Sequence, residues 1–490
     1  MSMLEIAAEI PQLLGDAATL VVIGRKSDLS DGWVLAGLPQ EVRDTAIRLA
    51  TDVRPGGGGA VASTLLPALA GLPRTLTLIA LHDHVSRHLS DTRSYEIFQH
   101  LRSTARTDGN KVAVLVALAS PDHAMGAWLG VVRSYPLYSR KTGNKAGLGQ
   151  VQVALRTRDG LFNHDLAGLQ RAGQALQLAQ RLVDMPTMEL TTEVFEQESR
   201  AAVQGLANVS VRSIVGDALL TEGLRGLHAV GRTAITAPRL VILDYAPADA
   251  QGEPIALIGK GLVYDTGGLS LKIVGDRMLT MKCDMGGAAA VLGAFVTLAS
   301  SGISRRIIAG LAIAENAIGP DSYRPDDVIE MHSGKTMEVN NTDAEGRIAL
   351  ADAASYVART YKPSTLIDAA TLTGSQLIAT GKWHAGIVSN DEGLELKTVA
   401  AGLASGDHCM PLLFSPELHI SEFKSTVADM RNSVADRNNA SSSASGLWVY
   451  LHIEDTGCKW AHVDLAGPAF LDNRGTGYGV GLLTSLVQSL

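Results

Sequence analysis

Three short segments in the second half of the chain concentrate residue types that bind metal ions or stabilise charge. They are Gly259–Lys272 (GKGLVYDTGGLSLK), Met281–Ala288 (MKCDMGGA) and Asn340–Leu350 (NNTDAEGRIAL). Their ionisable residues of interest are Lys260, Asp265, Lys272, Asp284, Asp343, Glu345 and Arg347. Four ionised carboxylates in one cleft would repel one another unless they were protonated or neutralised. Two divalent cations would balance that charge, and oxygen-rich ligands suit Mg²⁺, Mn²⁺ or Zn²⁺.

Such a set predicts hydrolytic chemistry. Bridging carboxylates hold two metal ions about 3.5–4 Å apart in metal-assisted hydrolases, and the bridged water has a lowered pKa and acts as the nucleophile. Each acid also has a structural explanation when it is taken alone. An aspartate at a strand end is commonly a cap or turn residue, and Asp343 could cap the helix that follows Glu345. The occurrence of the three segments together favours the metal site.

The segments must be positioned by an α/β framework. In the first third, short apolar runs separated by helix-like stretches predict strands at Thr19–Gly24, Thr75–Leu81, Val112–Leu118 and Val151–Leu155. Later strands are predicted at Leu240–Leu243, Ile255–Ile258, Arg306–Ile313, Thr365–Ala370 and Ala461–Leu465. Ligands of parallel α/β sheets bind outside the carboxyl ends of the strands, and polar or glycine-rich sequence follows each of these predicted strands.

The length of 490 residues suggests two or three domains at about 150 residues each. An apolar stripe over Asn163–Val183 predicts a long helix, which Pro186 ends. We therefore predict a smaller α/β domain over residues 1–162, a linker helix over 163–185, and a larger α/β domain with a central mixed sheet over 186–490. The serine-rich stretch Asn438–Ser445 (NNASSSAS) is predicted to be a surface loop.

Composition excludes several classes of protein. A hydrophobic fraction of 46% excludes a mostly disordered chain, and a net charge of −8 gives no basic footprint for nucleic acid. Three cysteines without a CxxC motif argue against a disulfide scaffold or a cysteine-rich zinc site. The N-terminus lacks the features of a signal peptide, and we find no run of about 18 apolar residues. A soluble protein of the cytoplasm is expected.

A family resemblance rests on these same segments. The motif NTDAEGR at Asn341–Arg347 matches the signature of the leucyl aminopeptidase (cytosol aminopeptidase) family of dinuclear-metal exopeptidases, and GKGLVYDTGG and KCDMGGAAA match its other metal-binding segments in order. The resemblance runs from about Leu182 to the C-terminus and includes ATLTG, VADMRNS and HVDLAG at Ala370–Gly374, Val427–Ser433 and His462–Gly467. Departures from the commoner pattern indicate the branch of probable aminopeptidases. They are DTGG in place of DSGG, a loop between Lys272 and Asp284 that is one residue longer, and the stretches Arg324–Asp327 and Asn432–Asn439.

The resemblance implies a role for each of the seven residues. The ligands of the tightly held metal ion would be Lys260, Asp265, Asp284 and Glu345. Those of the more exchangeable ion would be Asp265, Asp343 and Glu345, so that Asp265 and Glu345 bridge the two. Lys260 would bind as a neutral amine, which requires a strongly lowered pKa. The resemblance implies that Lys272 polarises the scissile carbonyl and stabilises its oxyanion. It implies that Arg347 binds a bicarbonate ion, which serves as proton shuttle.

The resemblance also implies the substrate and the assembly. The cofactors would be two Zn²⁺ or Mn²⁺ ions, and the substrates short peptides with a free N-terminus. Positions expected to contact the substrate are Met281, Asn341, Thr371, Leu372, Gly374 and the Ala466–Ala469 strand end. The pocket positions are small or apolar, which suits a leucine- or methionine-sized residue, and a methylene is worth only about 1–3 kcal/mol there, so specificity should be broad. A homohexamer is expected.

Two other readings stay open at this point. Some relatives bind DNA or serve as structural proteins, although the acidic charge and the retention of all seven residues disfavour both roles. A dinuclear hydrolase that acts on other small molecules would have a similar charge count. His462, on an apolar strand, is predicted to be a buried core histidine, and Cys283 to be structural or incidental.

Overall fold

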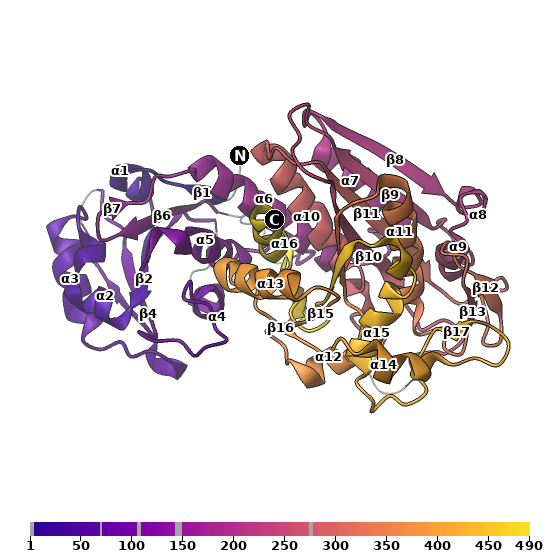
Figure 1. Cartoon of the computed structure of the whole chain (residues 1–490). Coiled ribbons are helices and arrows are strands. Elements are labelled where there is room, and N and C mark those ends of the chain that lie inside the picture. The colour runs from indigo at the N-terminus through magenta and orange to yellow at the C-terminus, as the bar shows by residue number, and fades with distance from the viewer. Residues whose placement is uncertain (1–3, 69–70, 105–108, 143–148, 274–277) are drawn as a thin grey trace. The chain divides into compact units, whose positions relative to one another are not determined.

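The computed structural model describes residues 4–68, 71–104, 109–142, 149–273 and 278–490 (Figure 1). The chain divides into two compact units, one of residues 1–174 with 402–407, and one of residues 175–401 with 408–490. The first division lies inside the long helix α6 (Leu166–Asp184), which forms where the apolar stripe predicts it. The predicted domain limits at residues 162 and 185 stay a proposal.

The first unit contains a seven-stranded sheet in the order β1-β6-β5-β2-β4-β3, with β7 paired to β6. Its strands are β1 (Leu4–Ile6), β2 (Thr19–Arg25), β3 (Val61–Leu65), β4 (Thr75–Leu81), β5 (Val112–Ala117), β6 (Val151–Thr157) and β7 (Gly160–Leu161). The four predicted strands are confirmed, and they pair in parallel. No strand was predicted at β1 or β7, which are very short, or at the antiparallel β3, which is partly exposed.

The helices of the first unit are α1 (Ile10–Leu14), α2 (Lys26–Asp31), α3 (Gln40–Ala50), α4 (Ser94–Thr104) and α5 (Ala124–Arg133). One core cluster forms where apolar side chains of β2 and β4 meet those of α3, such as Val42 and Ala46. This alternation of strands and covering helices is the α/β arrangement that the spacing of the apolar runs predicts.

The second unit is built on an eight-stranded sheet in the order β16-β15-β18-β14-β10-β11-β9-β8. Its strands are β8 (Val209–Val215), β9 (Arg239–Tyr245), β10 (Ile255–Asp265), β11 (Ile307–Asn316), β14 (Thr365–Ala370), β15 (Ala385–Ser389), β16 (Cys409–Pro411) and β18 (Lys459–Asp464). The central strands pair in parallel, whereas β9 pairs antiparallel with β11 and β15 with β18. The predicted α/β class with a central mixed sheet is therefore confirmed.

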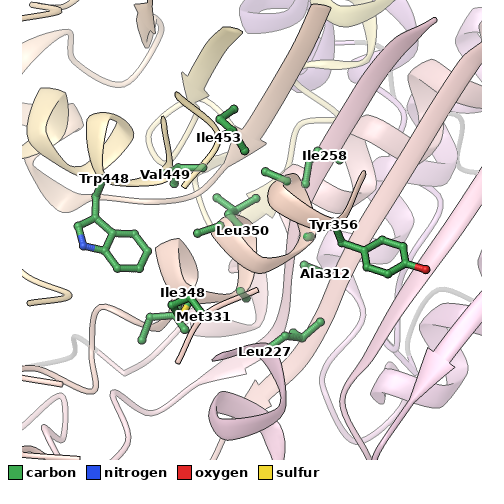
Figure 2. Close-up of a cluster of buried hydrophobic side chains, with 14 of the residues drawn as sticks. Leu227, Ile258, Ala312, Met331, Ile348, Leu350, Tyr356, Trp448, Val449 and Ile453 are labelled. Atoms are coloured by element: carbon green, nitrogen blue, oxygen red, sulfur yellow. The ribbon is translucent and has the colours of Figure 1, made fainter. Parts of the chain in front are cut away.

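The helices of the second unit include α7 (Thr192–Val203), α9 (Arg225–Gly231), α10 (Gly286–Ser301), α11 (Glu345–Tyr361), α12 (Gly374–Ala379), α13 (Glu392–Ser405), α15 (Ser441–Tyr450) and α16 (Val480–Ser489). Side chains of α9, α11 and α15 pack with the central strands in one apolar core. Figure 2 shows Leu350 of α11 lying between α15 on one side and the strands β10 and β11 on the other. This packing fixes the start of α11 relative to the ends of the strands.

The order in which strands are added to the sheet reverses around β10. It runs from β10 through α10 to β11 on one side, and later through α11 to β14 on the other side of β10. Because such crossovers are right-handed, α10 and α11 lie on opposite faces of the sheet (Figure 1). A Cβ on Gly259 would lie 2.4 Å from α10 at Ala288, and a Cβ on Gly346 of α11 would lie 2.4 Å from the Lys260 side chain. The carboxyl ends of these strands thus form the crevice where α/β sheets bind ligands.

One local prediction is wrong over part of its range. Asn438 and Asn439 are exposed and precede α15, but Ser441–Ser445 is not a surface loop, because α15 begins at Ser441 and Ser442, Ser443 and Ser445 are buried. The hydroxyl groups of Ser442 and Ser445 find partners inside the protein, so low hydrophobicity does not mean exposure here. In the described residues one helical stretch, Met281–Ser301, is long and apolar enough to span a membrane, but 89% of its apolar window is buried, as in the core helix of a sheet.

Candidate active site

The predicted metal ligands lie at the switch point of the sheet. Lys260 and Asp265 belong to β10, Asp284 ends the turn that leads into α10, and Glu345 is the first residue of α11. These four residues are at most 5% exposed. A register irregularity near the end of β10 separates Leu262 from Asp265, and Asp265 then pairs with the last residue of β11. The fold therefore gathers acids from three distant segments at one edge of the sheet.

Three of the carboxylates form a compact cluster. Ligand oxygens of Asp265, Asp284 and Glu345 all lie within 4.8 Å of one another. The Lys260 ammonium lies among them, 2.7 Å from Asp284 Oδ2 and 3.1 Å from Glu345 Oε1. It also donates to the Thr371 carbonyl at 2.9 Å. One nitrogen and three carboxylates thus converge on one small volume.

The fourth carboxylate lies at the other end of the cluster. Lys272 Nζ is 2.8 Å from Asp265 Oδ2 and 2.5 Å from Asp343 Oδ1. Asp343 lies in the turn before α11, where its backbone N–H donates to Asn341 Oδ1 at 2.9 Å. Asp265 is therefore shared by both halves of the cluster. The predicted loop before Asp284 falls partly outside the described residues, and Lys272 itself lies inside them.

The electrostatics of the cluster show that its own lysines do not neutralise it. Burial, with the nearby Glu345 carboxylate, raises the pKa of Asp265 to about 6, and burial raises the pKa of Asp284 well above its ordinary value. Burial alone would lower the pKa of Lys260, but the surrounding carboxylates outweigh it and hold that pKa above normal. Four carboxylates against two lysines leave an excess negative charge that divalent cations fit. The donor set, oxygen with one nitrogen, also suits them.

Arg347 is the third residue of α11 and is 6% exposed. Its Nη2 donates to Ser445 Oγ of α15 at 2.8 Å, whereas Nε and Nη1 have no hydrogen-bond partner within the described parts of the chain. Burial lowers the pKa of the guanidinium to about 10, despite the nearby Glu345 and Asp464. Unpaired donors beside a helix N-terminus suit a small anion.

The predicted substrate positions fall into two groups. Thr371, Leu372 and Ala466 surround two aspartates: the Thr371 hydroxyl donates to Asp284 Oδ1 at 2.8 Å, and the amides of Leu372 and Ala466 approach Asp464 Oδ1 at 3.2 and 3.4 Å. Gly374 begins the short helix α12 that follows.

The other two positions lie elsewhere around the cluster. Asn341 supports the turn that carries Asp343, through the hydrogen bond described above. Met281 is partly exposed in the 3₁₀ turn Met281–Cys283, next to Asp284. Cys283 is a buried free thiol in that turn.

Sequence reasoning missed several supporting residues. Asn316 ends β11 and donates to Asp265 Oδ1 at 2.8 Å, and Ser445 holds Arg347. His462 is fully buried and lies 2.5 Å from Asp368 Oδ1, which confirms the prediction of a core histidine. A polar residue at the carboxyl end of a predicted strand could have identified Asn316. No local signal could have identified Ser445.

Comparisons with known proteins agree with the geometry. The model of the cytosol aminopeptidase family, catalytic domain, matches residues 177–484. The chain is 40% identical over 417 residues to the probable aminopeptidase NPEPL1 of Mus musculus, covering 84% of this chain and 79% of that protein. The structure of leucyl aminopeptidase from Trypanosoma brucei in complex with actinonin superposes with a TM-score of 0.91 at 33% identity, over 100% of this chain and 96% of that one. The bottromycin maturation enzyme BotP in complex with Mn gives a TM-score of 0.77 at 26% identity, over 96% and 99% of the two chains.

Proposed function

As a member of the cytosol aminopeptidase family the chain is a metal-dependent aminopeptidase, and we propose that it removes leucine and other apolar N-terminal residues from short peptides with a water activated by two divalent ions. The observation that carries the proposal is the buried cluster of Asp265, Asp284 and Glu345, whose ligand oxygens lie within 4.8 Å. In a purely structural or DNA-binding role, no metal ions would neutralise the excess negative charge of this buried cluster, and the charge would destabilise the protein.

We assign one ion to Lys260, Asp265, Asp284 and Glu345, and the second to Asp265, Asp343 and Glu345. The shared position of Asp265, between Lys272 and the Lys260 half of the cluster, supports its bridging role. Two divalent ions held by these residues would supply a water of lowered pKa and a binding position for the free α-amino group of the substrate. We infer Zn²⁺ or Mn²⁺, and the Mn complex of BotP supports manganese.

The chain's own residues would then act on the peptide. Lys272, 15% exposed at its side chain, would release Asp343 and donate to the scissile carbonyl oxygen, where it stabilises the negative charge that develops. Arg347 would hold a bicarbonate ion through its unpaired Nε and Nη1 beside the site. The Thr371 hydroxyl would keep Asp284 oriented.

Substrate preference would follow from the segments around Asp464. A Cβ built on Gly286 would lie 3.3 Å from both Thr371 Cγ2 and Ala469 Cβ, so small side chains gather there. We propose that this surface, with Met281, Leu372, Gly374 and Ala466, receives an apolar side chain of broad type. Asn341 would contact the substrate from the turn before Asp343. A homohexamer in the cytoplasm is proposed from the family, and the three free cysteines are compatible with a reducing compartment.

The test is release of leucine from leucyl dipeptides by purified protein after chelation and after addition of Mn²⁺ or Zn²⁺. Metal-restored cleavage that spares an N-acetylated dipeptide would support both the metal site and recognition of the free amine. Equal cleavage of the blocked peptide would refute amine binding. Failure of every metal to restore cleavage, in protein that binds two ions per chain, would refute the proposed substrate class.

A further inference from the structure

Asn316 is a buried polar residue that the proposed reaction does not use directly. It is the last residue of β11, it is 0% exposed, and it lies in register with Asp265 of β10. The irregularity in β10 just before Asp265 lets these two residues pair across the strands. Asn316 thus lies behind the cluster, at the edge of the sheet where the acids converge.

The side-chain amide of Asn316 contacts both of the carboxylates that we assign as bridging ligands. Its Nδ2 lies 2.8 Å from Asp265 Oδ1 and 3.5 Å from Glu345 Oε2, and it donates to the Thr342 carbonyl at 3.0 Å. All three neighbours are acceptors, so the amide must turn its NH₂ group toward them. The donor is neutral, and therefore it orients the carboxylates without cancelling the charge that a metal ion needs.

The backbone of Asn316 holds a second segment of the site. Its carbonyl accepts from the Thr266 N–H at 3.1 Å and from the Thr266 hydroxyl at 2.7 Å. The Thr266 carbonyl in turn accepts from the Lys272 N–H at 3.0 Å. The threonine in DTGG therefore provides a hydroxyl that ties the Lys272 segment to β11, as a serine at that position also could.

Close packing leaves the amide little freedom to turn. A Cβ built on Gly268, which has a φ of +62°, would lie 3.0 Å from Asn316 Oδ1 and 2.9 Å from Thr342 Oγ1. Tyr323, which is 2% exposed, donates its hydroxyl to the same Thr342 carbonyl at 2.7 Å. Segments that carry Asp265, Lys272 and Glu345 are thus joined through one asparagine.

We propose that Asn316 is a positioning residue that sets the common orientation of Asp265 and Glu345 and thereby determines the affinity for the more exchangeable metal ion. The proposal rests on the two-ion site proposed above. Asp265 and Glu345 would each have to face two ions at once, which leaves little tolerance for rotation of either carboxylate. Groups that orient metal ligands typically contribute a factor of about 10–100 in metal affinity.

The test is a Mn²⁺ titration of metal-free protein, with free Mn²⁺ measured by electron paramagnetic resonance. Asn316→Leu removes the donor while it keeps a branched side chain with the same number of heavy atoms, and Asn316→Ala is the second variant. Asn390→Ala is the matched control, because Asn390 makes similar hydrogen bonds, to the Cys458 carbonyl at 3.2 Å and from the Trp460 N–H at 2.7 Å, without contact to a carboxylate of the cluster. We expect the Kd of the weaker ion to rise by about 10–100-fold in the Asn316 variants and to change less than about twofold in the control.

The outcomes separate this inference from the proposed function. Binding of fewer than two Mn²⁺ ions by the unaltered protein would refute the two-ion site itself. Two ions in the unaltered protein, with an unchanged weaker Kd in a folded Asn316 variant, would overturn only the role of Asn316. Loss of the fold in both Asn316 variants, judged by circular dichroism of metal-free protein, would make Asn316 a core residue and would overturn the proposal as well.

Discussion

Replacement of Arg347 by methionine should stabilise the protein while it removes most of the activity. The guanidinium is 6% exposed, and two of its three nitrogens lack hydrogen-bond partners within the described residues. A buried unpaired polar group costs about 1–3 kcal/mol. The low pKa of Arg347, about 10, shows that burial outweighs the attraction of Glu345 and Asp464. Arg347 is therefore a destabilising residue until an anion binds it.

The magnitude follows from these contacts. Methionine would remove two unpaired donors, worth about 2–6 kcal/mol together, and would lose the bond to Ser445, worth about 1.5–3 kcal/mol. Ser445 keeps its own bond to the Ser441 carbonyl. A net gain of about 1–3 kcal/mol is expected. The second unit has roughly 300 residues, so at about 2.1 cal/mol/K per residue this gain raises Tm by about 2–5 °C.

The assay is thermal unfolding of Mn²⁺-loaded protein in carbonate-free buffer, with kcat measured on a leucyl dipeptide. The kcat should fall by about 10²–10⁴ if Arg347 supports proton transfer. Bicarbonate at about tenfold above its Kd should raise the Tm of the unaltered protein by about 2 °C and should leave the variant unchanged.

Arg306→Met provides the control. Arg306 is paired through two bonds, of 3.0 and 2.7 Å, to the Asp244 carboxylate, its side chain is 37% exposed to water, and it lies over the Tyr361 ring. The same substitution there should lower Tm or leave it unchanged and should preserve kcat. A lower Tm for Arg347→Met in carbonate-free buffer would refute the reasoning from its unpaired donors, and an unchanged kcat would return Arg347 to a structural role.

Three further outcomes are expected. Chelation should lower Tm by about 8 °C, because two ions present at 100-fold above Kd contribute about 5 kcal/mol, and calorimetry before and after adding Mn²⁺ checks this. Glu345→Ala should abolish dipeptide cleavage and reduce the bound metal measured by mass spectrometry, whereas cleavage at the unaltered rate would refute the metal assignment. Burial, with Lys335 and Arg359 nearby, lowers the pKa of His452 to about 3, so the neutral native form loses stability as pH falls from about 6.5 toward 3. Urea unfolding should show about 2 kcal/mol of this loss by pH 5, and His452→Gln should remove it; an equal loss in that variant would assign it to other groups.

The strands and the metal-binding segments could be predicted because their signals are local. An apolar run of five to seven residues identifies a buried parallel strand, and β2, β4, β5, β6 and β14 formed where such runs occur. The acids of the cluster stand out since several ionisable residues follow strand ends that the fold must bring together. Edge strands such as β3 and β16 were not predicted because they are short or partly exposed.

The residues that support the charged groups, Asn316 and Ser445, could not be predicted because they are far in the sequence from the groups that they contact. Ser445 and Arg347 are separated by 98 residues, and Asn316 and Asp265 by 51. No sequence pattern around a single asparagine or serine predicts which charged group its side chain will contact. Only the folded sheet, with β11 beside β10 and α15 beside α11, determines those pairs.

The incorrect prediction for the serines of α15 has a physical cause. Serine-rich sequence is typical of loops, since serine competes with helical hydrogen bonds and contributes little apolar area. Here two of the buried hydroxyls bind the site or the helix itself: Ser442 donates to Asp464 at 3.0 Å, and Ser445 binds both Arg347 and the Ser441 carbonyl. Small residues are required because α15 packs closely, and a Cβ on Gly446 would lie 2.8 Å from the His462 ring. The same composition that resembles a loop is therefore what allows a helix to approach the charged centre of the site.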